Sequence, residues 1–298
     1  MMNTVLDNLT EEAERIRRLL EELFTHSSIR RVHNFGKRRD IVAVLVAQHS
    51  WQPLSDNGRQ IQSKALEEYR RFYSVLQTLL REQPEDALKK LKDSNQEVLE
   101  VIQQGGATYT PEARLDFEKA YTSLAQQVEL VNRLYGAPDD TVVFVPDTNA
   151  LLYNPDLEDW RFDDAPQFTI VLTPPVLSEL DLLKVNHRVE SVRDKSEKII
   201  RMVKEYRRRG KSSGRRLSEG VPLVKGVSNI MAIATEPDMD KSLPWLDAQN
   251  NDDRLLAGVI EVMRHHPRSP VLVVSRDINL QNKAEFANIT CVEPPTPK

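Results

Sequence analysis

The sequence of 298 residues has a single cysteine, six histidines and no long apolar run. Because Cys291 has no second cysteine to pair with, a disulfide within the chain is excluded. The longest uninterrupted apolar run, Ile41 to Ala47, is far too short to cross a bilayer. The N-terminus also lacks the basic, apolar and small-residue zones of a secretory signal. We therefore expect a cytoplasmic protein that has no membrane partner.

Acidic and basic residues are unevenly distributed along a chain of ordinary globular composition. Residues 147–181 contain eight acids and one base, whereas residues 188–216 contain twelve bases and four acids. This arrangement suits a site for divalent cations beside a surface that binds a polyanion. Two solvated faces of surface helices would explain the same pattern, so charge alone does not decide.

Hydrophobic periodicity divides the chain near Pro138. Apolar residues at three- and four-residue spacings, as in Thr4–Phe24 and Lys64–Arg81, predict an all-helical domain over residues 1–138. Within this domain we favour a buried helix over a strand for Ile41–Ala47. Residues 139–298 instead alternate short β-branched runs with helical segments, which predicts an α/β fold with a parallel sheet flanked by helices. The expected strands are Thr141–Val145, Phe168–Thr173, Val221–Lys225 and Val271–Ser275.

Carboxylates follow the expected strands at the edge where parallel sheets bind ligands. Asp147 directly follows the first strand, and Asp277 comes two residues after the last. Glu179 lies near the start of the helix after the second strand, and Asp252 and Asp253 open a later helix. Each acid alone is equally explained as a helix cap or as a favourable charge in a first helical turn. Together they bring four carboxylates to one edge of the sheet.

Carboxylates at such close quarters repel one another unless a cation or a proton intervenes. Mg²⁺ and Mn²⁺ prefer oxygen ligands and would relieve the repulsion. Zinc is disfavoured, because the histidines show no paired spacing typical of a zinc site. The acids therefore predict a Mg²⁺ or Mn²⁺ site.

The order of these motifs resembles the PIN domain family, to which many toxin, RNA-decay and RNA-processing nucleases belong. The resemblance extends from about Thr141 to Pro294 and leaves residues 1–138 unassigned. The matching segments are Asp147-Thr148-Asn149, Val176–Asp181, Asn251–Leu256 and Ser275–Leu280.

The resemblance implies a metal-dependent endoribonuclease that cuts single-stranded RNA and leaves a 5′ phosphate. It assigns Mg²⁺ or Mn²⁺ to Asp147, Glu179, Asp253 and Asp277. Asp253 is preferred to Asp252 because Leu256 and Ala257 follow it at the family's spacing; Asp252 remains the alternative. Polar neighbours would orient these carboxylates and their waters, namely Thr148, Asn149, Ser275 and Asn279.

The basic block divides into an expected helix, Arg188–Tyr206, and an expected flexible loop, Arg207–Arg216. Arginine and lysine bind phosphates without regard to sequence, so we expect the loop to bind RNA. Aromatic residues are sparse in this block, which gives base stacking little support. The residues expected to contact RNA are Arg207, Arg208, Arg209, Lys211, Arg215 and Arg216.

Three other interpretations of the α/β half remain open. One is a non-catalytic RNA-binding or scaffold protein, and another is a structure-specific DNA nuclease. The third is a phosphatase with Asp147 as nucleophile, although Asn149 stands where such enzymes place a second acid. The helical half has no excess of basic residues, and we expect it to serve oligomerisation, partner recognition or regulation.

Overall fold

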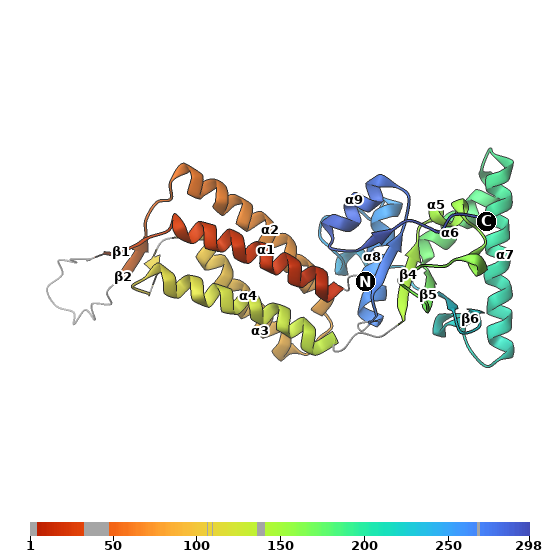
Figure 1. Ribbon diagram of the computed structural model, residues 1–298, viewed down its shortest axis with the longest axis horizontal. Helices are drawn as coiled ribbons and strands as arrows, with labels where there is room; N and C mark the ends of the chain where they lie inside the picture. The colour runs from red at the N-terminus through yellow and green to blue at the C-terminus, as the bar shows by residue number, and fades with distance from the viewer. Residues whose placement is uncertain (1–4, 33–47, 106, 109, 136–140, 267–268) are drawn as a thin grey trace. The chain divides into compact units, whose positions relative to one another are not determined.

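The computed structural model describes residues 5–32, 48–105, 107–108, 110–135, 141–266 and 269–298. The chain divides into two compact units, a helical unit and an α/β unit (Figure 1). The helical unit spans Leu9–Leu134, and the α/β unit spans Tyr135–Lys298 together with the chain up to Asn8. Two expectations, the boundary at Pro138 and the helix over Ile41–Ala47, lie outside the described residues.

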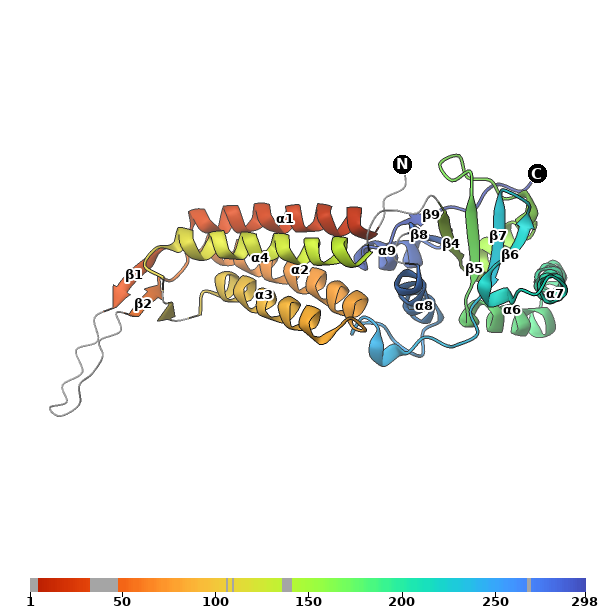
Figure 2. The ribbon, with the colours of Figure 1, turned by 90° about the horizontal axis from the view of Figure 1, so that it is seen from below.

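Four long helices form the helical unit, and they confirm the helical prediction for the first half of the chain. Figure 2 shows them side by side along their lengths. Residues at three- and four-residue spacings, among them Leu9, Ile16 and Leu20 of the first helix, are fully buried. The helices are α1 (Val5–Thr25), α2 (Asp56–Leu80), α3 (Glu85–Gln103) and α4 (Ala113–Tyr135).

A small antiparallel sheet lies at one end of the helical unit and was not predicted. Its strands are β1 (Ile29–Val32), β2 (Gln48–Trp51) and β3 (Ala107–Thr108), in the order β1-β2-β3. Strands of two to four residues are too short to show an alternating pattern. Pairing between residues 48–51 and 107–108 also joins segments far apart in sequence, so local pattern cannot reveal it.

The α/β unit is built on a six-stranded sheet of order β6-β7-β5-β4-β8-β9. Every neighbouring pair is parallel except β6 and β7, so the α/β prediction is confirmed. Strands β4, β5 and β8 are buried along their whole length, which explains their almost purely apolar sequences. The strands are β4 (Val142–Pro146), β5 (Phe168–Leu172), β6 (Val221–Val224), β7 (Ser228–Ala232), β8 (Val271–Val274) and β9 (Cys291–Val292).

Two of these strands, β7 and β9, were missed in the sequence. Strand β7 begins with Ser228 and Asn229, so it lacks the apolar start of its neighbours. It follows β6 through a tight turn in which Gly226 has a positive φ of 76°. Strand β9 has only two residues, Cys291 and Val292, and pairs with the end of β8.

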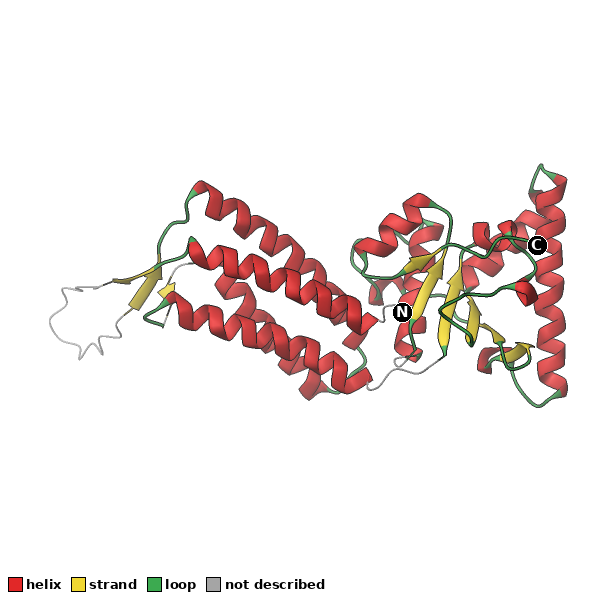
Figure 3. Ribbon diagram, viewed as in Figure 1, coloured by secondary structure: helices red, strands yellow, loops and turns green. Residues whose placement is uncertain are grey.

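Helices surround this sheet, whereas strands are confined to one end of the helical unit (Figure 3). None of the described helices is long and apolar enough to cross a membrane. The helices are α5 (Thr148–Tyr153), α6 (Pro174–Asn186), α7 (Glu190–Ser212), α8 (Asn251–His265) and α9 (Ile278–Phe286). Single turns of 3₁₀ helix are η1 (Leu157–Asp159), η2 (Leu217–Glu219) and η3 (Met239–Lys241).

Helix α7 corrects the expectation of a flexible basic loop from Arg207 onward. The helix continues to Ser212, so half of that segment is helical. Arginine and lysine are good helix formers, and Gly210 is accommodated for a packing reason rather than for flexibility. A Cβ atom at Gly210 would lie 2.7 Å from the Val221 side chain of β6. The chain leaves the helix through Gly214, which has a positive φ of 73°.

Candidate functional site

Asp147 directly follows β4, whose neighbours in the sheet are β5 and β8. Strand β4 pairs in parallel with β8, so Asp147 and Ser275 emerge side by side from neighbouring strand ends. The Ser275 hydroxyl donates to one Asp147 carboxylate oxygen, and the Ala150 amide donates to the other. Asp147 therefore caps α5 as well as lying at the strand edge, so the two interpretations of this residue are compatible.

Burial raises the pKa of Asp147 from 3.8 to about 6. Hydrogen bonds from Ser275 and Ala150 favour the charged form and oppose this rise, while the charges of Asp252 and Asp277 add to it. Asp147 is only 6% exposed, so little solvent screens these charges. The carboxylates of Asp147, Asp252 and Asp277 therefore share one electrostatic environment.

Glu179 reaches this edge from the first turns of α6. Pro174 begins that helix directly after β5, so its N-terminal end lies at the carboxyl edge of the sheet. The Thr148 hydroxyl donates to Glu179 Oε2 at 2.8 Å. Thr148 is the residue after Asp147, and the bond ties Glu179 to the segment that holds the first acid.

The neighbouring acids Asp252 and Asp253 lie in different environments. Asp253 is 5% exposed, and its two oxygens are engaged by Lys283 Nζ at 2.6 Å and by the Asp247 amide at 2.9 Å. Neither acid caps α8, because the Asn250 side chain accepts from the helical amides. Asp253 therefore connects α8 to α9 and to the preceding loop.

Asp252 is half-buried and belongs to the group of mutually repelling acids. Burial raises its pKa, the positive charge of Lys283 lowers it, and the charges of Asp277 and Asp253 raise it. The same carboxylate contributes to the raised pKa of Asp147. Electrostatic proximity thus associates Asp252, more than its neighbour, with Asp147 and Asp277. We call Asp147, Glu179, Asp252 and Asp277 the acidic edge.

Ser275 and Asp277 form a linked pair where β8 ends. Asp277 caps α9 by accepting from the Asn279 amide at 2.8 Å, and its own amide donates to Ser275 Oγ at 2.9 Å. Gln281 Nε2 donates to the Ser275 carbonyl at 3.0 Å. Gln281 was not predicted as a site residue, although its position four residues after Asp277 is a helical spacing that could have indicated it.

The predicted polar neighbours thus have different positions. The hydroxyls of Ser275 and Thr148 donate to the carboxylates of Asp147 and Glu179, respectively. Asn149 and Asn279 are exposed, and Asn279 contributes its backbone amide to the Asp277 cap. Lys283 was also missed; its position six residues beyond Asp277 carries no distinct signal in the sequence.

The chemistry of the acidic edge fits a hard divalent cation. All of its donors are oxygens. The pKa of Asp147 is raised chiefly by burial and further by the charges of Asp252 and Asp277, and a bound cation would relieve that repulsion. Within the described ranges, no three acid, histidine or cysteine side chains already form a closed ligand group. Two of the carboxylates instead accept from protein donors, Asp147 from Ser275 and Glu179 from Thr148. Cation binding would therefore require at least one carboxylate to turn from its present partner.

The basic residues predicted to bind RNA lie on the last turns of α7 and just beyond it. Arg207, Arg208 and Arg209 are exposed, but Arg209 is paired with Glu205 and lies over the Tyr206 ring. On the helix, Arg201, Lys204, Arg208 and Lys211 recur at spacings of three and four, so they share one face. We call these four residues the basic face of α7.

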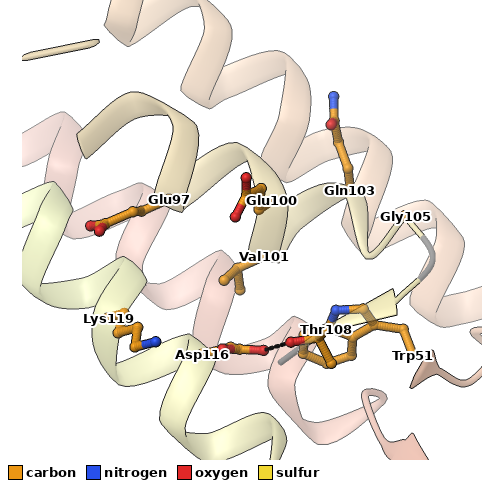
Figure 4. Close-up of a pocket in the computed structure, with 9 residues that line it drawn as sticks. All are labelled: Trp51, Glu97, Glu100, Val101, Gln103, Gly105, Thr108, Asp116 and Lys119. Carbon is orange, nitrogen blue, oxygen red and sulfur yellow. Dashed lines mark hydrogen bonds between the residues drawn. The ribbon is translucent and has the colours of Figure 1, made fainter. Parts of the chain in front are cut away.

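Acids also gather in the helical unit, around a pocket of about 370 Å³ (Figure 4). Glu97, Glu100 and Asp116 line it together with Trp51 and Lys119. Each acid accepts a hydrogen bond from a neutral side chain, as in the contact from Thr108 to Asp116 at 2.8 Å. We call these three acids the acidic pocket.

The fold and the acidic edge define an α/β domain of nuclease type. Residues 144–294 match the model of the PIN domain, slightly more than half of the chain, and the protein therefore belongs to this family. PIN domains are generally metal-dependent nucleases that act on RNA or DNA. The helical unit has no family match, and no curated protein matches the chain.

Proposed function

We propose that the α/β unit is a metal-dependent endoribonuclease that hydrolyses phosphodiester bonds in single-stranded RNA. The observation that carries the proposal is Asp147, a buried carboxylate at a strand end whose pKa is raised by burial and by two neighbouring acids. Such a concentration of charge lowers the free energy of unfolding. Acids with raised pKa values at the ligand-binding edge of a parallel sheet are therefore typical of a functional site.

In this proposal the acidic edge holds Mg²⁺ or Mn²⁺. Asp147, Glu179 and Asp277 are ligands, and of the two adjacent acids we assign Asp252 as the fourth ligand, since Asp253 is paired with Lys283. When bound, such an ion lowers the pKa of a water molecule and supplies hydroxide near neutral pH. Asp253 then has a structural role, because its contacts with Lys283 and the Asp247 amide fix the start of α8.

The protein's own side chains orient this site. Ser275 holds the Asp147 carboxylate through its hydroxyl, and Thr148 holds Glu179. Fixed orientation matters because a carboxylate that is free to rotate loses part of its binding energy to conformational entropy. Exclusion of bulk water around the buried Asp147 strengthens each of these interactions.

The choice of RNA as substrate rests on the family resemblance, and the basic face of α7 is proposed to bind its backbone. An exposed row of arginine and lysine binds a phosphate backbone without sequence preference. A structure-specific DNA nuclease would bind the same backbone, so the acids and the basic face do not separate the two substrates. The phosphatase interpretation has weaker support, because Asn149 is exposed and cannot act as a second acid.

The test is cleavage of labelled single-stranded RNA, single-stranded DNA and flapped DNA by wild type and by Asp147→Asn. Each protein is assayed with Mg²⁺, Mn²⁺ or a chelator. We expect wild type to cut RNA with either ion and to be inactive with chelator, and the variant to be inactive throughout. Equal RNA cleavage by the variant would refute the site, and preference for flapped DNA would refute the substrate. A wild type that binds RNA without cutting it would support a non-catalytic scaffold.

A further inference from the structure

A positively charged residue, Arg276, directly precedes Asp277 of the acidic edge in the sequence. Its neighbours are Ser275, which donates to Asp147, and Asp277, which caps α9. Arg276 is exposed, in contrast to the fully buried Ser275. The chain therefore carries an exposed arginine directly next to an acid of the candidate site.

The backbone that carries Arg276 is fixed on both sides. The Ser275 amide donates to the Val292 carbonyl at 3.0 Å, and the Ser275 carbonyl accepts from Gln281 at 3.0 Å. The Asp277 amide donates to Ser275 Oγ at 2.9 Å. Arg276 is therefore presented from a rigid support rather than from a loose loop.

The side chain of Arg276 is directed toward α5 by an aromatic contact. Its guanidinium carbon lies 4.1 Å from the centre of the Tyr153 ring. Tyr153 ends α5, the short helix that begins directly after Asp147. Because β4 and β8 are neighbours in the sheet, this contact carries the guanidinium from the end of β8 toward the helix that follows β4. The contact thus links the segment that carries Asp277 to the short helix that Asp147 caps.

Stacking on a ring leaves the hydrogen-bonding edges of a guanidinium available. The planar group contacts the ring with its face, while its N–H donors point outward in the plane, where they can bind a phosphate in bidentate fashion. Within the described part of the chain, Arg276 forms no ion pair with an acid. Arg209 also lies over a tyrosine, yet its charge is already paired with Glu205. Arg276 is therefore better suited to bind an anion from outside.

We infer that Arg276 binds a phosphate of the nucleic-acid substrate beside the bond that is cut, and that Tyr153 positions its guanidinium for this contact. The inference rests on the proposed nuclease function and names a substrate-binding residue of the same site. A phosphodiester that approaches the acidic edge is repelled by its carboxylates, and a single fixed cation at the rim offsets part of that repulsion.

The experiment compares Arg276→Met with Arg70→Met, which removes the same charge from an exposed position on α2 of the helical unit. Loss of a charge-assisted phosphate contact should lower kcat/KM of Arg276→Met by about 10- to 100-fold, with Arg70→Met unchanged. Arg276→Lys, which keeps the charge but loses the bidentate geometry, should be intermediate. Thermal melting of each variant verifies that it is folded.

A second measurement identifies the phosphate. Oligonucleotides in which one phosphate at a time is replaced by a neutral methylphosphonate are cut by wild type and by Arg276→Met. One position next to the cut should slow wild type about tenfold and leave Arg276→Met unaffected, because the contact is already lost. A purely structural role for Arg276 would not produce this position-specific insensitivity.

Tyr153 is tested in the same assay as a positioning residue. Tyr153→Phe keeps the ring and should retain full activity, whereas Tyr153→Leu should lose several-fold in kcat/KM. If wild type cuts RNA and Arg276→Met cuts it equally well with the same methylphosphonate profile, the inference is refuted and the proposed function stands. If wild type cuts no nucleic acid, both are refuted.

Discussion

Within the part of the chain that the structure describes, carboxylates gather at the acidic edge and in the acidic pocket, and the two groups differ in their electrostatics. In the acidic pocket of the helical unit, each acid accepts a hydrogen bond from a neutral side chain, and Lys119 contributes a positive charge to the lining. At the acidic edge, three of the acids lie in one another's field, and burial raises the pKa of Asp147 to about 6.

The comparison shows that the number of acids is a poor guide to function. What distinguishes the acidic edge is topology, because parallel strands and the helices that follow them deliver acids from distant parts of the sequence to one place. The acids of the pocket come from two neighbouring helices, α3 and α4, where surface charge is ordinary. The expected effects of mutation therefore differ sharply between the two places.

The largest expected difference is in catalysis. Asp147→Asn should lower RNA cleavage by about a thousandfold or more, because loss of a metal ligand removes several kcal/mol of transition-state stabilisation. The matched change in the acidic pocket, Asp116→Asn, should leave the cleavage rate within about twofold of wild type. Rates are measured on one labelled RNA with saturating Mg²⁺. A comparable loss in both variants would break the comparison and assign the pocket a role in catalysis.

Some residues of this candidate site could be predicted from the sequence, because buried apolar strands are easy to recognise and fix the positions of the acids that follow them. Asp147 and Asp277 could be predicted because each closely follows a fully buried apolar strand, whose end fixes the position of the acid. Glu179 could be placed near the same edge because Pro174 starts its helix right after β5. Its bond from Thr148 joins residues 31 positions apart and has no local signal.

The sequence favours Asp253 over Asp252 by the family's spacing, and the ion pair between Asp253 and Lys283 is what leads us to propose Asp252 instead. Adjacent residues on a helix point about 100° apart, so the choice depends on how α8 is rotated against the sheet. That rotation is set by contacts such as the Asn250 cap and the Lys283–Asp253 ion pair, which are tertiary. The extent of α7 was misjudged for a similar reason, because the packing of Gly210 against Val221 is not visible in composition.

The pair of adjacent acids gives the second prediction, which sharpens the definition of the acidic edge. Asp252→Asn should lower cleavage by about 100-fold, because a half-buried ligand is lost. It should not destabilise the protein, because burial disfavours the charged form of Asp252. Asp253→Asn should lower the free energy of unfolding by about 1–3 kcal/mol, because it weakens a buried charged contact to Lys283. Cleavage rates and urea denaturation are measured for both variants.

Lys283→Met provides the matched control for this second prediction. It removes the other half of the same ion pair and should destabilise the protein as Asp253→Asn does. Destabilisation in the double variant should be smaller than the sum of the two single effects. A result in which Asp253→Asn abolishes cleavage and Asp252→Asn does not would reassign the ligand to Asp253.

The third prediction concerns pH and stability in the presence of a chelator. The folded protein raises the pKa of Asp147 from 3.8 to about 6, so the ionised form is disfavoured in the folded state. The protonated Asp147 carboxyl therefore contributes fully to the free energy of unfolding below pH 3.8. This contribution is lost as the pH rises through 6 and the carboxyl ionises. Asp147→Asn removes the buried charge and should be more stable than wild type at pH 8 by up to about 3 kcal/mol.

The difference between the two proteins should shrink as the pH falls from 6 to 4, where the wild-type carboxyl becomes protonated. Denaturation at several pH values, with Asp116→Asn as a control that gains no stability, measures this. Added Mg²⁺ should stabilise wild type and not Asp147→Asn, since only the former keeps the ligand. If wild type is more stable than Asp147→Asn at pH 8 in chelator, the ionised Asp147 carboxylate does not destabilise the folded protein.

The smallest expected effects belong to the basic face of α7, which tests whether substrate affinity is separable from the acidic edge. Arg208→Gln should weaken RNA binding uniformly across sequences and reduce the salt dependence of binding by about one phosphate contact. Arg209→Gln should weaken RNA binding less, because its charge is already paired with Glu205.

Binding is measured by anisotropy at several salt concentrations in the Asp147→Asn background, which prevents cleavage. Lys89→Gln on α3 is the control, because it removes an equally exposed charge from the helical unit. If Arg208→Gln and Lys89→Gln have the same salt slope, Arg208 makes no phosphate contact. RNA would then bind elsewhere on the α/β unit, and the basic face of α7 would have no part in its affinity.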